Sequence, residues 1–182
     1  AEVLVVAPEV VRRLASTDTP QSPVAVVEIP DPVLPPEHEL LVAWGVRDPG
    51  NVGTLIRTAA AFGWAFAAGP ETADVWSPKV LRAAAGGHFH TTIGRADSLA
   101  ELAGWELVAT VASGGEPPST LHRIRHRAIL VGEEAAGLPD DVVAAVAHRV
   151  TIPMPGGTES LNAAVAGAIV VFEAAAGRGP DV

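Results

Sequence analysis

Short apolar segments alternate with helical segments over most of this 182-residue chain. Two of them, Leu40–Gly45 and Ala128–Val131, are continuous apolar runs with the length of a strand buried on both faces. Strands that alternate with helices are typical of a domain with a parallel sheet. We therefore predict an α/β fold. Further strands are expected at Trp64–Ala68, Leu107–Ala112 and Arg149–Ile152. Helices are expected at Val52–Phe62, Pro78–Ala85, Asp140–Val146 and Leu161–Ala176. The alternation continues at Phe89–Ile93 and Ser98–Leu102.

The first 36 residues are predicted to be separate from this domain. Short strands are expected at Val3–Ala7 and Val24–Ile29, with a helix at Pro8–Leu14 between them, and residues 16–23 have the composition of a turn. Four prolines then form a stiff linker, because each restricts the backbone and lacks a donor. We place a boundary near Glu37, after the prolines at positions 30, 32, 35 and 36, and predict one domain over residues 37–182.

Charge and composition narrow the classes of function. The net charge is −9, from 12 Lys+Arg and 21 Asp+Glu. That balance counts against a protein whose affinity depends on neutralising many phosphates, but it does not exclude a local basic patch. The absence of cysteine excludes disulfides and thiolate metal sites, and it suits a cytoplasmic protein. No apolar run approaches the ~20 residues of a membrane span, so no membrane association is expected.

Several common sites have no sequence signature here. The histidines at positions 88 and 90, and at 122 and 126, have no carboxylate or thiolate partner at metal-ligand spacing, so no metal is expected. The G-x-G-x-x-G, P-loop and G-x-S-x-G motifs are absent. The sequence therefore gives no motif support for a dinucleotide oxidoreductase, a P-loop NTPase or an α/β-hydrolase.

The first of three motif blocks is Arg47–Gly63, in which a loop opens a helix. Positions 52, 55, 56, 59 and 60 form an apolar stripe for packing on the sheet, and Arg57 falls off that stripe. Open α/β sheets bind ligands in loops at the carboxyl ends of their strands. Asn51 and Arg57 are therefore candidate site residues, although taken alone they also fit a helix N-cap and a solvated arginine.

Two later blocks have the same strand, loop and helix order. Ile129–Pro139 contains Gly132, which lets a ligand approach the backbone, and then a carboxylate that either meets a ligand or caps the next helix. In Ile152–Asn162, the prolines at 153 and 155 have no N–H, so main-chain donors must come from residues 154, 156 and 157. Such a loop can hold an adenine edge. Ser160 is expected to cap the closing helix and to leave Asn162 in its first turn.

The closing helix is apolar all round, so both of its sides are expected to be buried. One side carries positions 161, 164, 165, 168, 169 and 172, and the other carries 163, 166, 167, 170, 171 and 174. One side can pack on the sheet and the other on a second subunit, which predicts a homodimer.

Three arginines, Arg123, Arg125 and Arg127, would share one face of an extended segment. Such a strip fits contact with phosphates, or a charged edge that blocks aggregation.

Taken together, the three blocks resemble the SpoU/TrmH family of the SPOUT superfamily of RNA methyltransferases. Asp48–Ala59 is similar to the first family motif, Gly132–Leu138 to the second and Ile152–Asn162 to the third, and the resemblance covers about residues 38–176. It implies a Rossmann-like parallel sheet with a C-terminal trefoil knot that binds S-adenosylmethionine. It also implies a dimer and methyl transfer to a ribose 2′-hydroxyl of RNA.

The resemblance also implies roles for single residues. The positions that surround the chemistry in the family match Asn51, Arg57, Glu134, Ser160 and Asn162. The cofactor contacts match Gly132, Ile152 and Leu161, with Met154 nearby.

Two arginines are expected to contact RNA. Arg82 matches a family position linked to RNA contact. Because an arginine is effectively always protonated, we expect Arg57 to hold the RNA phosphate and ribose rather than to act as a base.

Residues 1–36 resemble the end of the ribosomal-protein-like RNA-binding domain that precedes the catalytic domain in longer members. The main part of that domain is not in this sequence, so we expect a fragment or a sequence that starts late. Longer relatives of this kind mostly act on ribosomal RNA, which favours rRNA over tRNA as the substrate. The alternative function is a non-catalytic RNA-binding or dimerisation module that keeps the fold.

Overall fold

The computed structural model describes residues 2–15 and 23–176, and the chain divides into two compact units, residues 1–31 and residues 32–182. In the first unit, α1 (Pro8–Leu14) forms where a helix is predicted. The strands predicted at Val3–Ala7 and Val24–Ile29 are wrong, because both segments are exposed and neither joins the sheet of the described residues. The turn predicted at residues 16–23 lies outside the described residues except for its last position.

The second unit includes the proline segment. The N–H of Val33 donates a hydrogen bond to the oxygen of Ile93 at 3.3 Å. A Cβ added to Gly94 would lie only 2.5 Å from the oxygen of Val33, so the two backbones are in close contact. The segment around Val33 therefore packs along the sheet edge, and the larger unit begins at Pro32, ahead of the boundary predicted near Glu37.

Six strands form one sheet in the order β3-β2-β1-β5-β4-β6, and every neighbouring pair is parallel. This confirms the predicted parallel α/β fold, whereas the knot stays a prediction. The central strand is buried on both faces, since Leu41 and Ala43 join one hydrophobic cluster while Leu40 and Val42 join the other. The strands are β1 (Leu40–Ala43), β2 (Ala65–Ala68), β3 (Ile93–Arg95), β4 (Glu106–Thr110), β5 (Arg127–Val131) and β6 (His148–Val150).

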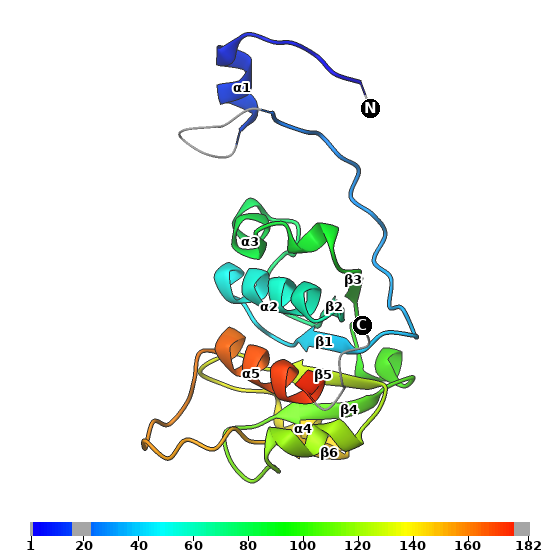
Figure 1. Cartoon of the computed structure of the whole chain (residues 1–182), viewed down its shortest axis with the longest axis vertical. Helices are drawn as coiled ribbons and strands as arrows, with labels where there is room; N and C mark the ends of the chain where they lie inside the picture. The colour runs from blue at the N-terminus through cyan, green and yellow to red at the C-terminus, as the bar shows by residue number, and fades with distance from the viewer. Residues whose placement is uncertain (1, 16–22, 177–182) are drawn as a thin grey trace. The chain divides into compact units, whose positions relative to one another are not determined.

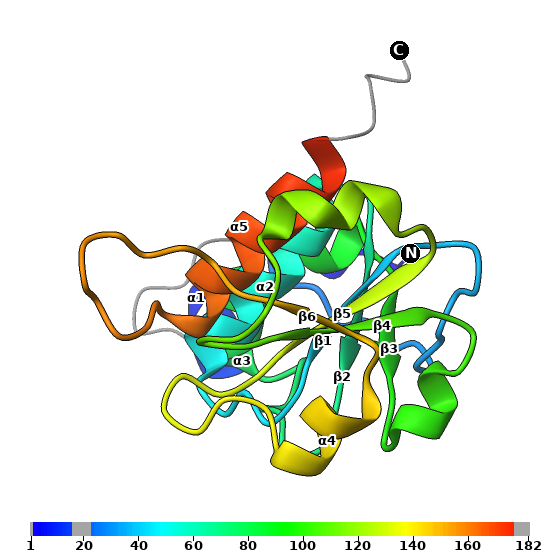
Figure 2. The same ribbon diagram turned by 90° about the horizontal axis from the view of Figure 1, so that it is seen from below.

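Helices cover both faces of the sheet (Figure 1, Figure 2). Residues of α2, α3, α5 and η3 share one cluster, and residues of α4 and η2 share the other. Ser98–Leu102 holds η2, and Phe89–Ile93 runs from the end of η1 to the start of β3. Within the described residues, no helix has the length and apolarity needed to cross a membrane. The helices are α2 (Pro49–Ala61), α3 (Pro78–Ala84), α4 (Asp140–Ala145), α5 (Ala163–Ala176), η1 (Gly87–Phe89), η2 (Leu99–Leu102) and η3 (Pro118–Arg123).

Helix α5 packs on the body of the domain through the side with more small residues. Its buried positions are 163, 164, 167, 170, 171 and 174. Gly167 lies so close to α2 that an added Cβ would be 2.5 Å from Cδ2 of Leu55. Val165 and Phe172, on the other side, remain exposed.

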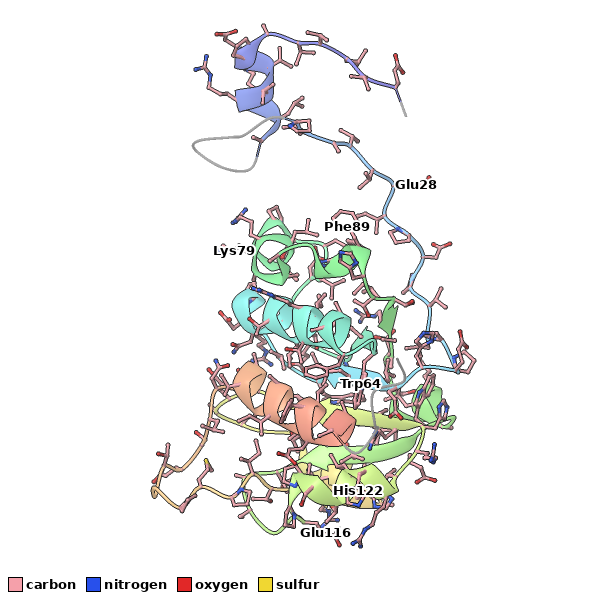
Figure 3. All side chains as sticks on the ribbon, viewed as in Figure 1. Glu28, Trp64, Lys79, Phe89, Glu116 and His122 are labelled. Atoms are coloured by element: carbon pink, nitrogen blue, oxygen red, sulfur yellow. The ribbon has the colours of Figure 1, made fainter. Side chains whose placement is uncertain are left out.

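Arg127 is the largest fully buried side chain in the described residues. Its Nε donates to Oε2 of Glu39 at 2.8 Å, and its Nη2 donates to the oxygen of Ala174 at 3.0 Å. Its Nη1 donates to the oxygen of Leu121. The guanidinium also lies 5.5 Å from the ring centroid of Trp64, which Figure 3 labels. This one side chain therefore joins the start of β5 to β1, η3 and the last turn of α5.

The predicted strip of three RNA-facing arginines is wrong at Arg127. Arg123 ends η3 and Arg127 begins β5, so the segment between them is not one extended strand. Only 2% of the Arg127 side chain is exposed, and its charge is matched by buried Glu39. A guanidinium in this position cannot reach an RNA phosphate.

We predict that Arg127→Met lowers the free energy of unfolding by about 3–5 kcal/mol, because it removes the opposite charge from the buried Glu39 carboxylate. The double variant Glu39→Leu/Arg127→Met should recover much of that loss, since an apolar pair avoids the desolvation of two charges. Urea unfolding of the three proteins measures both values. A single variant within about 1 kcal/mol of the unaltered chain would contradict the role given to this pair.

Candidate active site

A cleft opens at the edge of the sheet where β4, β5 and β6 end. Its empty volume is about 630 Å³ including the open mouth, and mostly apolar side chains line it. Parallel strands place all their carboxyl ends at one edge, which is where open α/β sheets bind ligands. All four residues predicted to contact a cofactor line this cleft: Gly132, Ile152, Met154 and Leu161.

Gly132 has no room for a side chain. An added Cβ would lie 2.3 Å from the carbonyl carbon of Gly137 and 2.4 Å from its oxygen. Two hydrogen bonds close the turn between them, from Glu133 N–H to Gly137 O at 3.2 Å and from Gly137 N–H to Glu133 O at 2.8 Å. Gly137 has a φ of 71°, a left-handed conformation that glycine adopts without strain. The two glycines thus fold the loop back beyond β5, and Glu134 lies within that loop.

Asn162 joins three elements of the site. Its Oδ1 accepts hydrogen bonds from the N–H groups of Ala164 at 3.0 Å and Val165 at 3.1 Å, which makes Asn162 the N-cap of α5. Because the oxygen is used in the cap, the amide nitrogen must point the other way. Nδ2 donates to Oδ1 of Asn51 at 2.8 Å and to Oε1 of Glu134. Three of the predicted catalytic residues therefore meet through one amide.

Ser160 has a different place from the one predicted. It lines the cleft, and α5 begins only at Ala163, so Asn162 is the cap in its place. Serine and asparagine cap helices about equally well, so their order in the sequence does not show which one the helix uses.

Asn51 lies in the first turn of α2. Asp48 is the N-cap of this helix and accepts the N–H of Asn51 at 2.8 Å, so Asn51 is not the cap. Two residues later, Gly53 meets α3 so closely that an added Cβ would lie 2.5 Å from Cβ of Ala83. The first motif therefore supplies a cap, a buried amide for the site and a close contact between helices.

Arg57 is exposed on α2 and is not among the residues that line the cleft. Its side chain makes no hydrogen bond or ion pair with any other described residue. Gly87 of η1 packs against its backbone, with an added Cβ 3.1 Å from Cα of Arg57. The structure thus separates Arg57 from the three hydrogen-bonded residues and leaves its side chain exposed.

The other predicted RNA contacts lie in two places. Arg82 is exposed on α3, the helix that packs on α2. Arg123 and Arg125 are exposed just before the start of β5, which is the amino edge of the parallel sheet and thus opposite the cleft. Their contact with RNA stays a prediction.

The motif blocks missed one wall of the cleft. Thr110, Val111 and Ala112 line it at the end of β4. The end of the strand predicted at Leu107–Ala112 was a signal for this wall, because it reaches the same edge as β5 and β6. Within the described residues, no group of three or more His, Asp and Glu side chains could hold a metal ion.

One charged group near this edge is perturbed. Arg47 forms an ion pair with Glu71. The hydrogen bond and charge of Glu71, together with the charge of Glu133, raise the pKa of Arg47 above its usual value. Arg47 therefore keeps its charge at the edge where the cleft opens.

The SpoU rRNA Methylase family matches residues 39–172 of the chain. The 23S rRNA (guanosine(2553)-2′-O)-methyltransferase RlmP of Bacillus subtilis is 36% identical over 166 residues, which cover 87% of this chain and 66% of that protein. The tRNA (guanosine(18)-2′-O)-methyltransferase of Escherichia coli is 33% identical over 140 residues, which cover 71% of this chain and 59% of that protein.

The chain is also similar in structure to solved RNA methyltransferases. The SpoU methyltransferase AviRb from Streptomyces viridochromogenes, in complex with the cofactor AdoMet, has a TM-score of 0.71 and 29% identity, covering 82% of this chain and 66% of that chain. The AdoMet-bound rRNA methyltransferase from Sinorhizobium meliloti has a TM-score of 0.70 and 34% identity, covering 76% of this chain and 56% of that chain. The chain thus spans under two thirds of the length of these relatives.

We predict that Asn162→Asp destabilises the protein at pH 8 and that acid reverses most of the loss. The new carboxylate keeps the cap acceptor but loses both amide donors and lies against Glu134. Adjacent carboxylates bind a shared proton more tightly when folded, so stability is lost as pH rises through that titration. Urea unfolding should show a loss of about 1–3 kcal/mol at pH 8 and a much smaller loss near pH 4.

Asn162→Ala is the matched control, because it removes the cap and the donors without adding a charge. Its loss of stability relative to the unaltered chain should change little with pH. An Asn162→Asp loss that is equally independent of pH would contradict the contact with Glu134.

Proposed function

The chain belongs to the SpoU rRNA methylase family, and on that premise we propose that it transfers a methyl group from S-adenosylmethionine to a ribose 2′-hydroxyl of RNA. One observation carries the proposal. Asn162 is hydrogen-bonded to both Asn51 and Glu134. Its sequence neighbours Leu161 and Ala163 line the cleft. A merely structural helix cap does not require an amide and a carboxylate from two other elements.

The cleft fits the proposed cofactor chemically. Ile152, Leu161 and Val170 offer apolar surface for an adenosine, while Glu133 and Glu134 place negative charge beside it. S-adenosylmethionine, when bound, supplies a methyl group activated by a positively charged sulfonium. The two carboxylates favour that positive charge.

The ribose 2′-hydroxyl is a poor nucleophile, so the protein must orient it. Asn51 and Glu134 present oxygen acceptors that Asn162 holds in place. Ser160 adds a hydroxyl from the cleft wall. Arg57, always protonated, binds the phosphate next to the target ribose and so sets the position of the sugar.

Ribosomal RNA is the proposed substrate, ahead of tRNA. The Bacillus subtilis relative is named for 23S rRNA, and so is a relative from Streptomyces viridochromogenes that is 31% identical over 191 residues. The Escherichia coli relative named for tRNA keeps the second substrate open to test. We infer a cytoplasmic location from these RNA substrates. The three side chains of Asn51, Glu134 and Asn162 are joined by hydrogen bonds. This arrangement favours catalysis over a non-catalytic RNA-binding or dimerisation module.

We also propose a homodimer through the exposed side of α5. Val165 is 47% exposed and Phe172 56% exposed. Phe172 meets Phe62 of the α2 C-terminus edge to face, with ring centroids 6.3 Å apart. Exposed apolar side chains gathered on two helices are typical of subunit contacts.

We predict that S-adenosylmethionine binding is sensitive to a methyl group at Gly132 and not at a glycine outside the cleft. Gly132→Ala must displace backbone at Gly137 and should weaken S-adenosylmethionine binding at least about tenfold. Gly104→Ala, at an exposed position before β4, meets nothing within 4 Å and should leave the affinity within about twofold. Calorimetric titration measures both, with cooperative unfolding as the check on folding. Equal affinities in the two variants would contradict the proposed site.

We predict that Arg57→Ala lowers methyl transfer at least ~10²-fold while S-adenosylmethionine affinity is kept. The reason is that Arg57 positions RNA and does not line the cleft. The matched control is Arg149→Ala, an exposed arginine on β6 that should change the rate less than about threefold. Unchanged turnover of Arg57→Ala on a substrate RNA would remove this residue from the mechanism.

We predict that Phe172→Glu converts the protein from a dimer to a monomer, because it buries a charge at the proposed contact. Sedimentation should give twice the 18.6 kDa of one chain before the change and one chain mass after it. A variant that remains a dimer would place the interface elsewhere.

A further inference from the structure

One long segment of this acidic chain is nearly free of acidic residues. From Pro49 to Ala96 the sequence contains only Glu71 and Asp74 as acids, although the whole chain has 21. This segment builds α2, α3 and η1, and none of these three elements contains a carboxylate. The same elements carry Arg57, Lys79 and Arg82, which are all exposed. A local surface suited to a polyanion therefore exists despite the net charge of −9.

Phe89 stands on that surface. It is 84% exposed, more than any other large hydrophobic side chain in the described part of the second unit. Figure 3 labels it on η1. The face of its ring is therefore open to stack on a planar ligand.

The backbone holds Phe89 outward from a rigid base. Ala85 and Gly86 both have positive φ, 48° and 88°, so the chain turns sharply after α3. Gly87 then packs against the backbone of Arg57, where an added Cβ would lie 3.1 Å from its Cα. Phe89 thus lies two residues from a direct contact with the helix that carries Arg57.

His88 ties the same loop to the segment before α3. Its Nε2 is 2.8 Å from the oxygen of Val75, and its ring lies 5.1 Å from the ring of Trp76. These contacts hold His88 inward, whereas no ring contact among the described residues involves Phe89.

We propose that Phe89 is a stacking platform for an unpaired base of the RNA substrate, next to the phosphate bound by Arg57. This rests on the proposed function. Nucleobases stack on exposed aromatic rings whatever their sequence, and arginines beside the ring hold the backbone. The ring, the two arginines and the absence of carboxylates from α2, α3 and η1 together favour a single-stranded segment over a duplex, since a base inside a helix has no free face.

The test compares three substitutions at one position. Binding of a short fluorescein-labelled oligouridylate to the unaltered chain, Phe89→Ala, Phe89→Leu and Phe89→Trp is followed by anisotropy over a range of salt concentrations. Phe89→Ala and Phe89→Leu should weaken binding about tenfold, whereas Phe89→Trp should keep or improve it. The dependence of affinity on salt should stay the same in all four proteins, because stacking neutralises no phosphate.

Several outcomes would overturn the platform. The first is that the unaltered chain does not bind oligouridylate. The second is a Phe89→Ala affinity within twofold of that of the unaltered chain. The third is a Phe89→Leu affinity equal to that of the unaltered chain, which would indicate apolar contact without stacking. A change of sedimenting mass in Phe89→Ala would assign the ring to a subunit contact.

Calorimetry with S-adenosylmethionine and a methyl-transfer assay on the unaltered chain separate the two proposals. If both succeed while Phe89→Ala binds RNA normally, the platform fails and the proposed function stands. If both fail while Phe89→Ala loses oligouridylate, the proposed methyl transfer fails and Phe89 is a base-stacking residue of an RNA-binding module.

Discussion

The parallel direction of all six strands is the constraint on which the site depends. It brings the ends of β4, β5 and β6 to one edge, so that loops far apart in the sequence must meet there. Asn162 then makes this meeting specific. Its oxygen caps α5, and its nitrogen bonds Asn51 and Glu134. The start of α5 and the polar site therefore share the side chain of Asn162, so a change in one alters the other.

Glycines set how closely the surrounding backbone can approach. Gly132 allows the loop with Glu134 to fold back, Gly53 brings α3 onto α2, and Gly167 brings α5 onto α2. At the opposite end of α5, buried Arg127 bonds the carbonyl oxygen of Ala174. The helix that carries Asn162 is thus fixed at its start by the site, in its middle by close packing and at its end by a buried charge.

Patterns local in the sequence predicted most of the fold, and contacts distant in the sequence account for the errors. Apolar runs and glycine-containing loops placed the strands, the helices of the larger unit and the cleft residues. Arg127 was misplaced because its partner Glu39 is 88 residues away, and nothing near Arg127 signals burial. Ser160 was chosen over Asn162 as the cap because both residue types accept the same hydrogen bonds. The apolar stripe of α5 could not show which side packs inward, since both sides are apolar.

The most direct test of the account is to incubate the chain with RNA and S-adenosylmethionine carrying an isotopically labelled methyl group, and then to identify the labelled nucleoside by mass spectrometry. The account predicts label on the ribose 2′-oxygen, with none formed by the Asn162→Ala variant. Label on a base would contradict the proposed reaction. Equal ribose labelling by Asn162→Ala would contradict the site built around its amide.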